Sequence, residues 1–439
     1  MANIYFISLG CDKNRIDAEI MLKKLSDAGH DIVADAAEAD CAVVNTCGFI
    51  ESAKQEAIDA VFDMVREKQK GRLRALVVTG CLAERYRAQV ADEIPEIDAV
   101  VGLAGNADIC AVVEAALAGK KEQRFGEKTA LPLGGARLLS TPPHYAYIKI
   151  AEGCSNHCTY CAIPSIRGPF RSRAQADILD EAASLARDGV RELIVIAQDT
   201  TSYGRDLGGG ESLAGLLAAL SRIDGLWKIR VLYAYPDRID DALIGAMASL
   251  PKVARYLDLP LQHADGGVLR RMGRFGDRAA LLALLQKLRA RIPGITLRST
   301  FIVGFPGETD AQFEELLGFL RDAQFDRAGC FEYSPEEGTP AERLAPRIGD
   351  DVKAARAARF REVQSAIMAA KNRDKIGARA QVICDGFDEQ KGMFACRSEG
   401  EAPDIDPIVW LPLSCDLMVG DVYDVRITGA DDVDVYAEL

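Results

Sequence analysis

The strongest constraint on the fold is a sixfold repeat of an apolar, strand-like segment and a helical segment between residues 145 and 333. The strand-like segments are residues 145–151, 192–197, 229–233, 255–259, 296–303 and 328–333. Helix-period stretches such as 177–188 and 279–291 separate them. Strands joined through helices pair in parallel, so six such units predict a partial (βα)6 barrel with its active site at the carboxyl ends of the strands.

Two further regions flank this repeat. Residues 1–117 alternate short apolar runs, at 4–8, 31–34, 41–45, 75–79 and 99–101, with helical stretches, which predicts an open parallel sheet. Residues 118–143 are interpreted as a linker, and a long helix is expected over 351–375. Residues 377–439 carry short strands punctuated by glycine, which is typical of a small β-barrel of the oligonucleotide-binding kind. The predicted α/β chain therefore has three domains, at 1–117, 140–375 and 377–439.

Three cysteines follow the first barrel strand at a C-x3-C-x2-C spacing: Cys154, Cys158 and Cys161, here called the barrel cysteines. Three thiolates so close in sequence can hold three irons of a four-iron cluster and leave the fourth iron open. An open iron can bind and reduce S-adenosylmethionine, which gives a carbon-centred radical for chemistry that no side chain can do alone. Zinc is the alternative, since C-x2-C is a zinc spacing and His157 could complete a Cys3His set.

A second set of cysteines, here called the sheet cysteines, consists of Cys11, Cys47 and Cys81. Each comes within three residues of the end of a predicted strand, and a glycine adjoins each one. Because the carboxyl ends of parallel strands line one edge of a sheet, the three should converge although they are far apart in sequence. A lone cysteine after a strand is usually a core residue, but the threefold recurrence predicts a second three-cysteine cluster site with one iron free.

The composition narrows the function classes. The chain has 439 residues, with 53 basic against 66 acidic side chains and a net charge of −13, which argues against a general nucleic-acid coat. The first residues lack the basic leader of a signal peptide, and no apolar run approaches the roughly 18 residues of a membrane helix. We therefore expect a cytoplasmic protein with no membrane partner. Its twelve cysteines are interpreted as metal ligands or core residues, not as a disulfide framework.

Motifs around both cysteine sets resemble those of the methylthiotransferase family of radical S-adenosylmethionine enzymes. They are Ser-Leu-Gly-Cys-Asp-Lys-Asn-Arg at 8–15, Asn-Thr-Cys-Gly-Phe at 45–49, Thr-Gly-Cys at 79–81, Glu-Gly-Cys at 152–154, Leu-Pro-Leu-Gln-His at 259–263, Gly-Phe-Pro-Gly-Glu at 304–308 and Phe-Glu-Tyr-Ser-Pro at 331–335. The match covers nearly the whole chain, and residues 377–439 resemble the TRAM domain with which the family ends.

The resemblance implies two four-iron four-sulfur clusters, S-adenosylmethionine and an electron donor. It also implies the insertion of sulfur and a methyl group at an unactivated C–H bond. One S-adenosylmethionine would methylate a sulfur species at the cluster of the sheet cysteines. A second would be cleaved at the cluster of the barrel cysteines, and its 5′-deoxyadenosyl radical would remove a hydrogen from the substrate carbon.

The family has two branches with different substrates. One modifies an adenosine in transfer RNA, and the other modifies the β-carbon of an aspartate in the small-subunit ribosomal protein S-twelve. The opening Ser-Leu-Gly-Cys-Asp-Lys-Asn-Arg-Ile-Asp at 8–17 resembles the second branch. Because the β-hydrogen of an ionised aspartate is too weakly acidic for a side-chain base, no catalytic acid or base is nominated. His263 is interpreted as a binding or structural group.

The charge of the C-terminal region supports a basic protein substrate independently. Residues 377–439 carry four basic and fourteen acidic side chains, a net charge of −10. Barrels of this kind that hold RNA present a cationic groove, whereas this region should repel phosphate and attract a basic protein. A solvated acidic surface kept for solubility is the plain alternative. Transfer-RNA modification and a non-enzymatic iron–sulfur carrier remain alternative functions, with transfer RNA as the less favoured partner.

Contacts to S-adenosylmethionine are expected at the carboxyl ends of the barrel strands. The candidates are Gln198, Gln262, Arg298, Gly304 and Tyr333. Many radical enzymes carry a Gly-Gly-Glu run after the second strand, where this chain has Ala-Gln-Asp at 197–199. This departure leaves open how the ammonium group of S-adenosylmethionine is bound.

Overall fold

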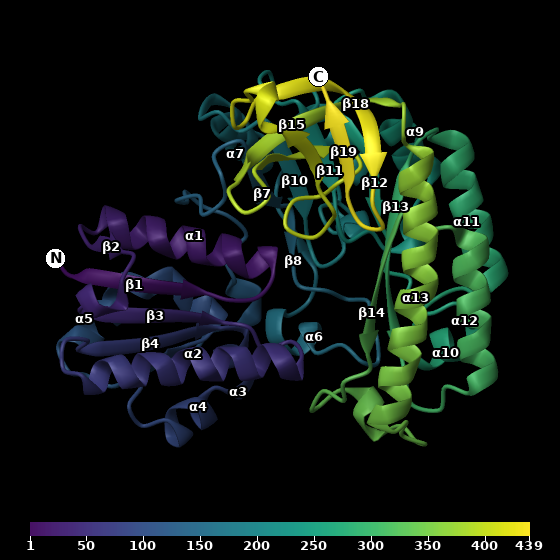
Figure 1. The fold of residues 1–439 in the computed structure, drawn as a ribbon. Helices are drawn as coiled ribbons and strands as arrows, with labels where there is room; N and C mark the ends of the chain where they lie inside the picture. Colours follow the sequence, from purple (N-terminus) through teal and green to yellow (C-terminus); the bar gives the residue numbers. More distant parts are fainter.

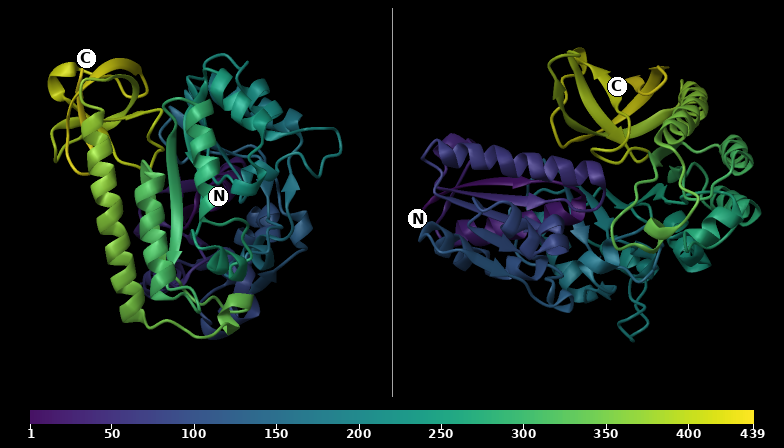
Figure 2. Two further views of the ribbon diagram at one scale, coloured as in Figure 1. Left: turned by 90° about the vertical axis from the view of Figure 1, so that its right-hand side faces the viewer. Right: turned by 90° about the horizontal axis from the view of Figure 1, so that it is seen from below.

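The computed structural model describes all 439 residues, whose strands form three main sheets. An N-terminal sheet unit lies beside a central half-barrel, and a small C-terminal barrel covers one end of the half-barrel (Figure 1). Two further views show the same three bodies, with the long helix α13 (Asp350–Asp374) leading into the C-terminal barrel (Figure 2). The predicted α/β architecture is confirmed. The domain boundaries drawn from the sequence stay a prediction.

The N-terminal sheet unit is an open, wholly parallel sheet with the strand order β2-β1-β3-β4-β5-β6. Apolar residues point from its central strands to both faces, so helices cover both sides. The strands are β1 Asn3–Ser8, β2 Asp31–Val33, β3 Cys41–Thr46, β4 Ala75–Gly80, β5 Ala99–Val101 and β6 Glu122–Arg124. The helices are α1 Asp12–Asp27, α2 Glu51–Gln69, α3 Cys81–Tyr86, α4 Ala88–Glu93 and α5 Ile109–Leu117.

The sixth strand of this sheet corrects the sequence prediction. The sequence predicts an irregular linker over 118–143, whereas β6 pairs in parallel with β5. The three residues of β6 are Glu, Gln and Arg, and the strand lies at the edge of the sheet. Hydropathy cannot reveal such a strand because it contains no apolar side chain.

The half-barrel is a six-stranded parallel sheet with the order β14-β13-β12-β11-β10-β7, as the sixfold repeat predicts. Its strands are β7 Tyr145–Lys149, β10 Glu192–Ile196, β11 Lys228–Val231, β12 Val253–Asp258, β13 Thr296–Val303 and β14 Arg327–Glu332. A two-stranded ribbon consists of β8 Ala151–Glu152 and β9 Arg171–Ser172. The helices are α6 Ile163–Arg167, α7 Gln175–Arg187, α8 Leu213–Leu220, α9 Asp241–Ser249, α10 Gly266–Arg271, α11 Arg278–Arg291, α12 Asp310–Ala323 and α13. No helix in the structure has both the length and the apolar character needed to cross a membrane.

The two faces of the half-barrel belong to different cores. Its outward face packs on the surrounding helices in the largest core, which has 47 buried residues. Its inward face carries Tyr145, Tyr147 and neighbouring side chains. The other two units fill this concave face with Ile16 and Ile20 of α1 and Ala402 of the C-terminal barrel. The open side of the half-barrel is therefore closed by protein.

The C-terminal barrel is closed, with the strand order β15-β16-β17-β19-β18. Its strands are β15 Arg379–Asp388, β16 Met393–Ser398, β17 Val409–Pro412, β18 Val422–Ala430 and β19 Val435–Glu438. The sequence predicts strands at residues 381–385, 393–397, 408–411 and 422–427 but not β19, which completes the barrel by pairing with β17 and β18. Buried ion pairs dock the barrel on the first residues of two half-barrel strands: Arg397 on Glu192 and Glu401 on Arg327. It therefore covers the amino-terminal ends of the strands, opposite the ends that carry active sites in such barrels.

Candidate metal centres

The sheet cysteines lie at the carboxyl ends of three strands that are neighbours in the sheet. Cys11 caps α1 after β1, Cys47 follows β3, and Cys81 is the first residue of α3 after β4. The loops are closely packed. A Cβ atom built on Gly10 (φ +93°) would lie 3.2 Å from the Cys47 sulfur, and one on Gly48 would lie 2.8 Å from the Cys81 carbonyl carbon. The sheet thus brings these loops together, as the sequence predicts.

The thiols of this set influence one another electrostatically. Burial raises the pKa of the Cys81 thiol to about 12, and the charges of Cys11 and Cys47 act in the same direction. Burial likewise raises the pKa of Cys47. Since metals bind the thiolate, loading this site must release protons from these thiols.

The barrel cysteines lie on the loop between β8 and α6, at the mouth of the half-barrel. Gly153 (φ +75°) starts this loop, and a Cβ atom there would lie 2.2 Å from the carbonyl oxygen of Pro169. The backbone N–H of Cys154 donates to the carbonyl of Gly168 (3.1 Å), and that of Cys161 donates to the carbonyl of Cys158 (3.1 Å). Gly153 and these two hydrogen bonds fix the conformation of the loop that carries all three barrel cysteines.

Cys158 has two polar neighbours from the half-barrel. Nη1 of Arg274 lies 3.8 Å from its sulfur, and the Tyr235 hydroxyl lies 3.9 Å away. The Arg274 guanidinium also stacks 4.0 Å from the centre of the Tyr235 ring. Burial, together with the charges of Cys158 and Cys154, raises the pKa of Cys161 to about 12. A buried cation therefore stands beside this set, where it favours the thiolate form.

The two sets fit a large metal group better than a single ion. No three His, Cys, Asp or Glu side chains lie close enough together to hold one metal ion. A zinc ion draws its ligands to one point, at about 2.3 Å from each sulfur, whereas a four-iron cluster takes each thiolate at a separate iron. His157, the residue that would complete a zinc set, is exposed. The arrangement therefore suits clusters, and zinc is not favoured.

The candidate S-adenosylmethionine contacts divide into two groups. Gln262 and Tyr333 line one cavity of about 710 Å³, which also contains Tyr160 beside Cys161. Gln262 has a left-handed backbone (φ +73°), a strain that often marks functional sites. The buried Tyr333 hydroxyl has no hydrogen-bond partner. This cavity therefore offers an unsatisfied polar group to a ligand.

The other three candidates make contacts within the protein. Gln198 donates to Glu152 (3.3 Å), and its buried Oε1 atom has no partner. Arg298 forms ion pairs with Asp258 (2.9 Å) and Asp406 (3.4 Å). A Cβ atom at Gly304 (φ +72°) would lie 2.4 Å from Cγ of Lys353, so this glycine allows α13 to approach closely.

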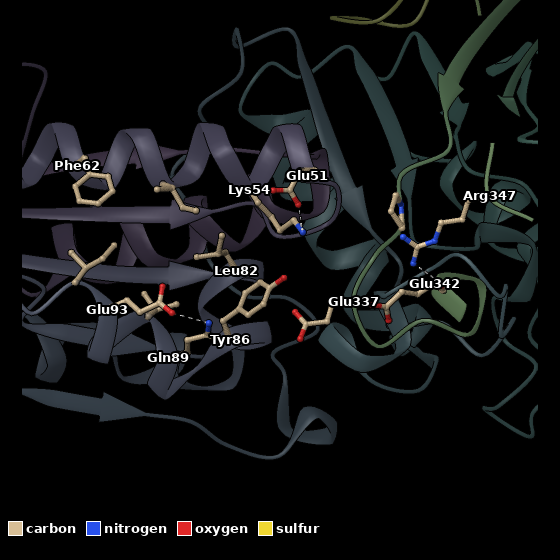
Figure 3. Close-up of a pocket in the computed structure, with 14 residues that line it drawn as sticks. Glu51, Lys54, Phe62, Leu82, Tyr86, Gln89, Glu93, Glu337, Glu342 and Arg347 are labelled. Atoms are coloured by element: carbon tan, nitrogen blue, oxygen red, sulfur yellow. Dashed lines mark hydrogen bonds and ion pairs between the residues drawn. The ribbon is translucent and has the colours of Figure 1, made fainter. Parts of the chain in front are cut away.

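A second cavity, of about 540 Å³, lies between α2–α4 of the N-terminal sheet unit and the segment 335–347 (Figure 3). Apolar side chains, among them Ile58 and Leu82, line part of it, and Leu82 directly follows Cys81. Two cations, Lys54 and Arg347, face a larger number of carboxylates. The carboxylates are those of Glu51, Glu93, Glu337 and Glu342. The cavity is therefore acidic overall.

Comparison with known proteins agrees with this arrangement. Uncharacterized protein family UPF0004 matches residues 3–102, the radical SAM superfamily matches residues 148–320, and the TRAM domain matches residues 376–439. The ribosomal protein uS12 methylthiotransferase RimO of Desulforamulus reducens is 46% identical over the full length of both chains. That of Pelotomaculum thermopropionicum is 47% identical over 99% of this chain and 98% of its own. The chain belongs to the RimO family of methylthiotransferases.

Membership in the RimO family and the radical SAM superfamily implies an enzyme that uses S-adenosylmethionine and a four-iron four-sulfur cluster. Solved structures agree at the level of the fold. The radical S-adenosylmethionine methyltransferase TsrM of Kitasatospora setae has a TM-score of 0.59 at 14% identity, over 77% of this chain and 76% of its own. The radical enzyme OxsB has a TM-score of 0.52 at 12% identity, over 83% of this chain and 56% of its own.

Sequence reasoning missed a buried charge network between the two cysteine sets. Lys149 and Arg167 of the half-barrel form ion pairs with Asp17 of α1 and with Glu152. Asp17 and Glu152 belong to motifs that carry the family resemblance, but no sequence pattern indicates that they form ion pairs. His263 is fully buried, with its Nε2 atom 3.7 Å from a Glu308 carboxylate oxygen, which fits its interpretation as a structural group.

Proposed function

We propose that this chain transfers a methylthio group to the β-carbon of an aspartate in the small-subunit ribosomal protein uS12. The observation that carries the proposal is the pair of three-cysteine sets in a chain whose full-length relatives are named uS12 methylthiotransferases. One set lies at a sheet edge and the other at the half-barrel mouth, and one buried charge network contacts both units. A ribosomal substrate would place the enzyme in the cytoplasm.

We propose that each set binds one four-iron four-sulfur cluster. When bound, the clusters supply the electron that cleaves S-adenosylmethionine and a site at which sulfur is methylated. The protein's own part is to hold thiolates and exclude water. Arg274 and Tyr235 contact the Cys158 sulfur, whereas at the other site Cys81 is buried and Cys11 is exposed, so water is excluded from only part of that site.

We propose that S-adenosylmethionine binds in the cavity lined by Gln262 and Tyr333. The unpartnered Tyr333 hydroxyl supports this placement because a buried hydroxyl without a hydrogen bond is costly. Gln198, Arg298 and Gly304 are proposed as further contacts, although in this structure each of them contacts other residues of the chain.

Surface charge supports a basic protein as the substrate. Of the fourteen acidic residues in 377–439, eight are exposed, against three exposed basic residues. Two of the others, Glu401 and Asp406, form ion pairs with Arg327 and Arg298 of the half-barrel, so the surface is less acidic than the sequence count suggests. The cavity in Figure 3 adds a second acidic surface beside the sheet cysteines. Both surfaces attract cations and repel the phosphates of transfer RNA.

The decisive experiment incubates the anaerobic holoenzyme with S-adenosylmethionine, a chemical reductant, a sulfide source and purified uS12, followed by peptide mass spectrometry. A methylthio group on an aspartate of uS12 is expected. Methylthio-adenosine formed on transfer RNA under the same conditions would transfer the assignment to the other branch. If no 5′-deoxyadenosine forms, the proposed enzymatic function is refuted and a non-enzymatic iron–sulfur carrier is the remaining alternative.

The metal content is measured on the same preparation. About eight irons per chain are expected, and replacement of the three barrel cysteines by alanine should leave about four. Tightly bound zinc in place of iron would refute the radical mechanism. These values separate the two-cluster proposal from the choice of substrate, because iron is counted without any substrate present.

A further inference from the structure

Arg167 reaches from the half-barrel to the sheet cysteines. It is the last residue of α6, six positions after Cys161, and is 1% exposed. Its Nη2 atom lies 3.5 Å from the Cys81 sulfur. Its Nη1 atom lies 3.1 and 3.2 Å from the two carboxylate oxygens of Glu152. One buried guanidinium therefore joins the chain just after the barrel cysteines to a ligand position of the other set.

Asn14 extends this contact to the other two cysteine loops. Its Oδ1 atom lies 3.4 Å from Nη2 of Arg167. Its Nδ2 atom donates to the carbonyl of Leu9 (2.6 Å), two residues before the first sheet cysteine. The same atom lies 3.3 Å from the carbonyl of Thr46, the residue before the second. Arg167 and Asn14 together thus contact the loops of all three sheet cysteines.

The four side chains of the ion-pair network around Arg167 carry no net charge before any thiol is ionised. Lys149 and Arg167 face the carboxylates of Asp17 and Glu152 at distances of 2.7 to 3.1 Å. The side chains of all four residues are at most 11% exposed. A thiolate at Cys81 therefore adds one uncompensated negative charge in a buried place. A buried anion of this kind needs a donor, and Arg167 provides one.

We propose that Arg167 is a positioning residue for the metal group of the sheet cysteines, donating to the Cys81 sulfur and aligning the other two loops through Asn14. The inference rests on the proposed function, because it takes the sheet cysteines to hold an iron–sulfur cluster. Hydrogen bonds to the sulfurs tune the reduction potential of such clusters. They favour the reduced state because it carries one more negative charge. Loss of the donor should lower the potential and loosen the iron.

The test uses the full chain with the barrel cysteines replaced by alanine, so that one cluster remains to be observed. In this parent, Arg167→Gln should shift the midpoint potential to lower values in an EPR-monitored titration. It should also speed iron release to a chelator by about ten-fold, as expected for loss of a charge-assisted hydrogen bond. Arg167→Lys keeps the charge but not the planar fork, so it should give a smaller shift in the same direction. It also serves as the test variant if Arg167→Gln does not fold.

Arg230→Gln is the matched control. Arg230 is also fully buried on the half-barrel and pairs with a buried glutamate, Glu192 (2.8 Å), but it contacts β10, β12 and the C-terminal barrel. Its substitution should leave the potential unchanged. An unchanged potential in both Arg167 variants, or an equal shift in Arg230→Gln, would overturn the positioning role. A parent that binds no iron would instead overturn the two-cluster proposal, and this inference with it.

Discussion

Glu192 provides a sharp test of how the C-terminal barrel is docked. Its carboxylate is fully buried and accepts hydrogen bonds from Arg230 Nε (2.8 Å) and from Arg397. Arg397 has a second carboxylate partner in Asp385, at 2.6 and 2.9 Å. Arg230 has no second carboxylate within ion-pair distance. Glu192→Gln therefore leaves Arg230 as a buried cation without a counter-charge.

The expected cost follows from that geometry. Removing one partner of a buried ion pair costs about 3–5 kcal/mol, because the other charge stays desolvated. Arg230 keeps the carbonyl of Glu399 (2.8 Å) and the face of Tyr256, so we expect about 3 kcal/mol, the lower end of this range. This is more than a hundred-fold in the equilibrium constant for barrel docking. Glu399→Gln is the matched control. Glu399 also forms an ion pair, with Lys228 (3.0 Å), but its side chain is 36% exposed. That variant should lose about 1 kcal/mol or less.

The assay is anaerobic urea unfolding followed by tryptophan fluorescence. The chain has two tryptophans, and Trp410 is buried in the C-terminal barrel. In a Trp227→Phe background, Trp410 alone reports on that barrel. Glu192→Gln should lower the urea midpoint of the Trp410 signal far more than Glu399→Gln does. Equal losses in the two variants would show that the buried charge does not govern docking.

The remaining predictions concern pH, the sheet cysteines and the acidic surface. Burial alone would raise the pKa of Glu192, but Arg397 and Arg230 lower this pKa by more than burial raises it. The ionised carboxylate therefore stabilises the fold fully above the ordinary glutamate pKa of about 4.3, and this stabilisation is lost as pH falls through the lower pKa that Glu192 has in the folded chain. The stability gap between the native chain and Glu192→Gln should therefore narrow below about pH 4, and a constant gap would contradict this assignment. Cys81→Ala should abolish methylthio transfer to uS12, yet 5′-deoxyadenosine should still form, because the barrel cysteines belong to another unit; normal transfer would exclude a sulfur site at Cys81. Reversing the charge of four exposed acids should slow association with uS12 and flatten the salt dependence of the association rate. Each substitution should cost under about 0.5 kcal/mol of folding free energy. If the native chain binds transfer RNA more tightly than uS12, the charge argument is refuted. The four substitutions, measured by surface plasmon resonance at several salt concentrations, are Asp421→Lys, Asp424→Lys, Asp432→Lys and Glu438→Lys.

The choice of these acids shows what the structure adds to a charge count. Asp431 is exposed, but its carboxylate accepts the backbone N–H groups of Val433 and Asp434, so its reversal would disturb a turn. Deletion of residues 377–439 would also be a poor test of the acidic surface, because it would disturb the half-barrel. It would leave Glu192 and Arg327 of the half-barrel without their partners Arg397 and Glu401.

The sequence predicts most of the fold because apolar periodicity is strong in the central strands. All six half-barrel strands and five of the six N-terminal strands are found within a few residues of the predicted positions. Strands β6 and β19 are not predicted because each is short. The residues of β6 are polar, and β19 lies where apolar residues alternate with acidic ones. Their pairing partners are distant in sequence, so only tertiary context shows that they are strands.

The sites are predicted unevenly for a similar reason. The convergence of Cys11, Cys47 and Cys81 follows from the topology of parallel strands, which sequence can reveal. The contacts of Arg298 and Gly304 depend on how α13 and the C-terminal barrel pack, which no local pattern encodes. Arg167 has no sequence signal beyond its place six residues after Cys161, and its role becomes visible only when two units meet.

Helix α1 makes the relative position of the two cysteine sets a property of the fold. Cys11 is its N-cap, and its first turns contact the half-barrel: Asp12 accepts from the Tyr233 hydroxyl (3.0 Å), and Asp17 pairs with Lys149 (2.7 Å). On the same helix, Ile16 and Ile20 enter the concave core of the half-barrel. Because apolar burial and buried ion pairs both fix this helix, the N-terminal sheet unit cannot rotate on the half-barrel without losing both. A fixed separation suits chemistry in which a group prepared at one set must meet a carbon activated at the other.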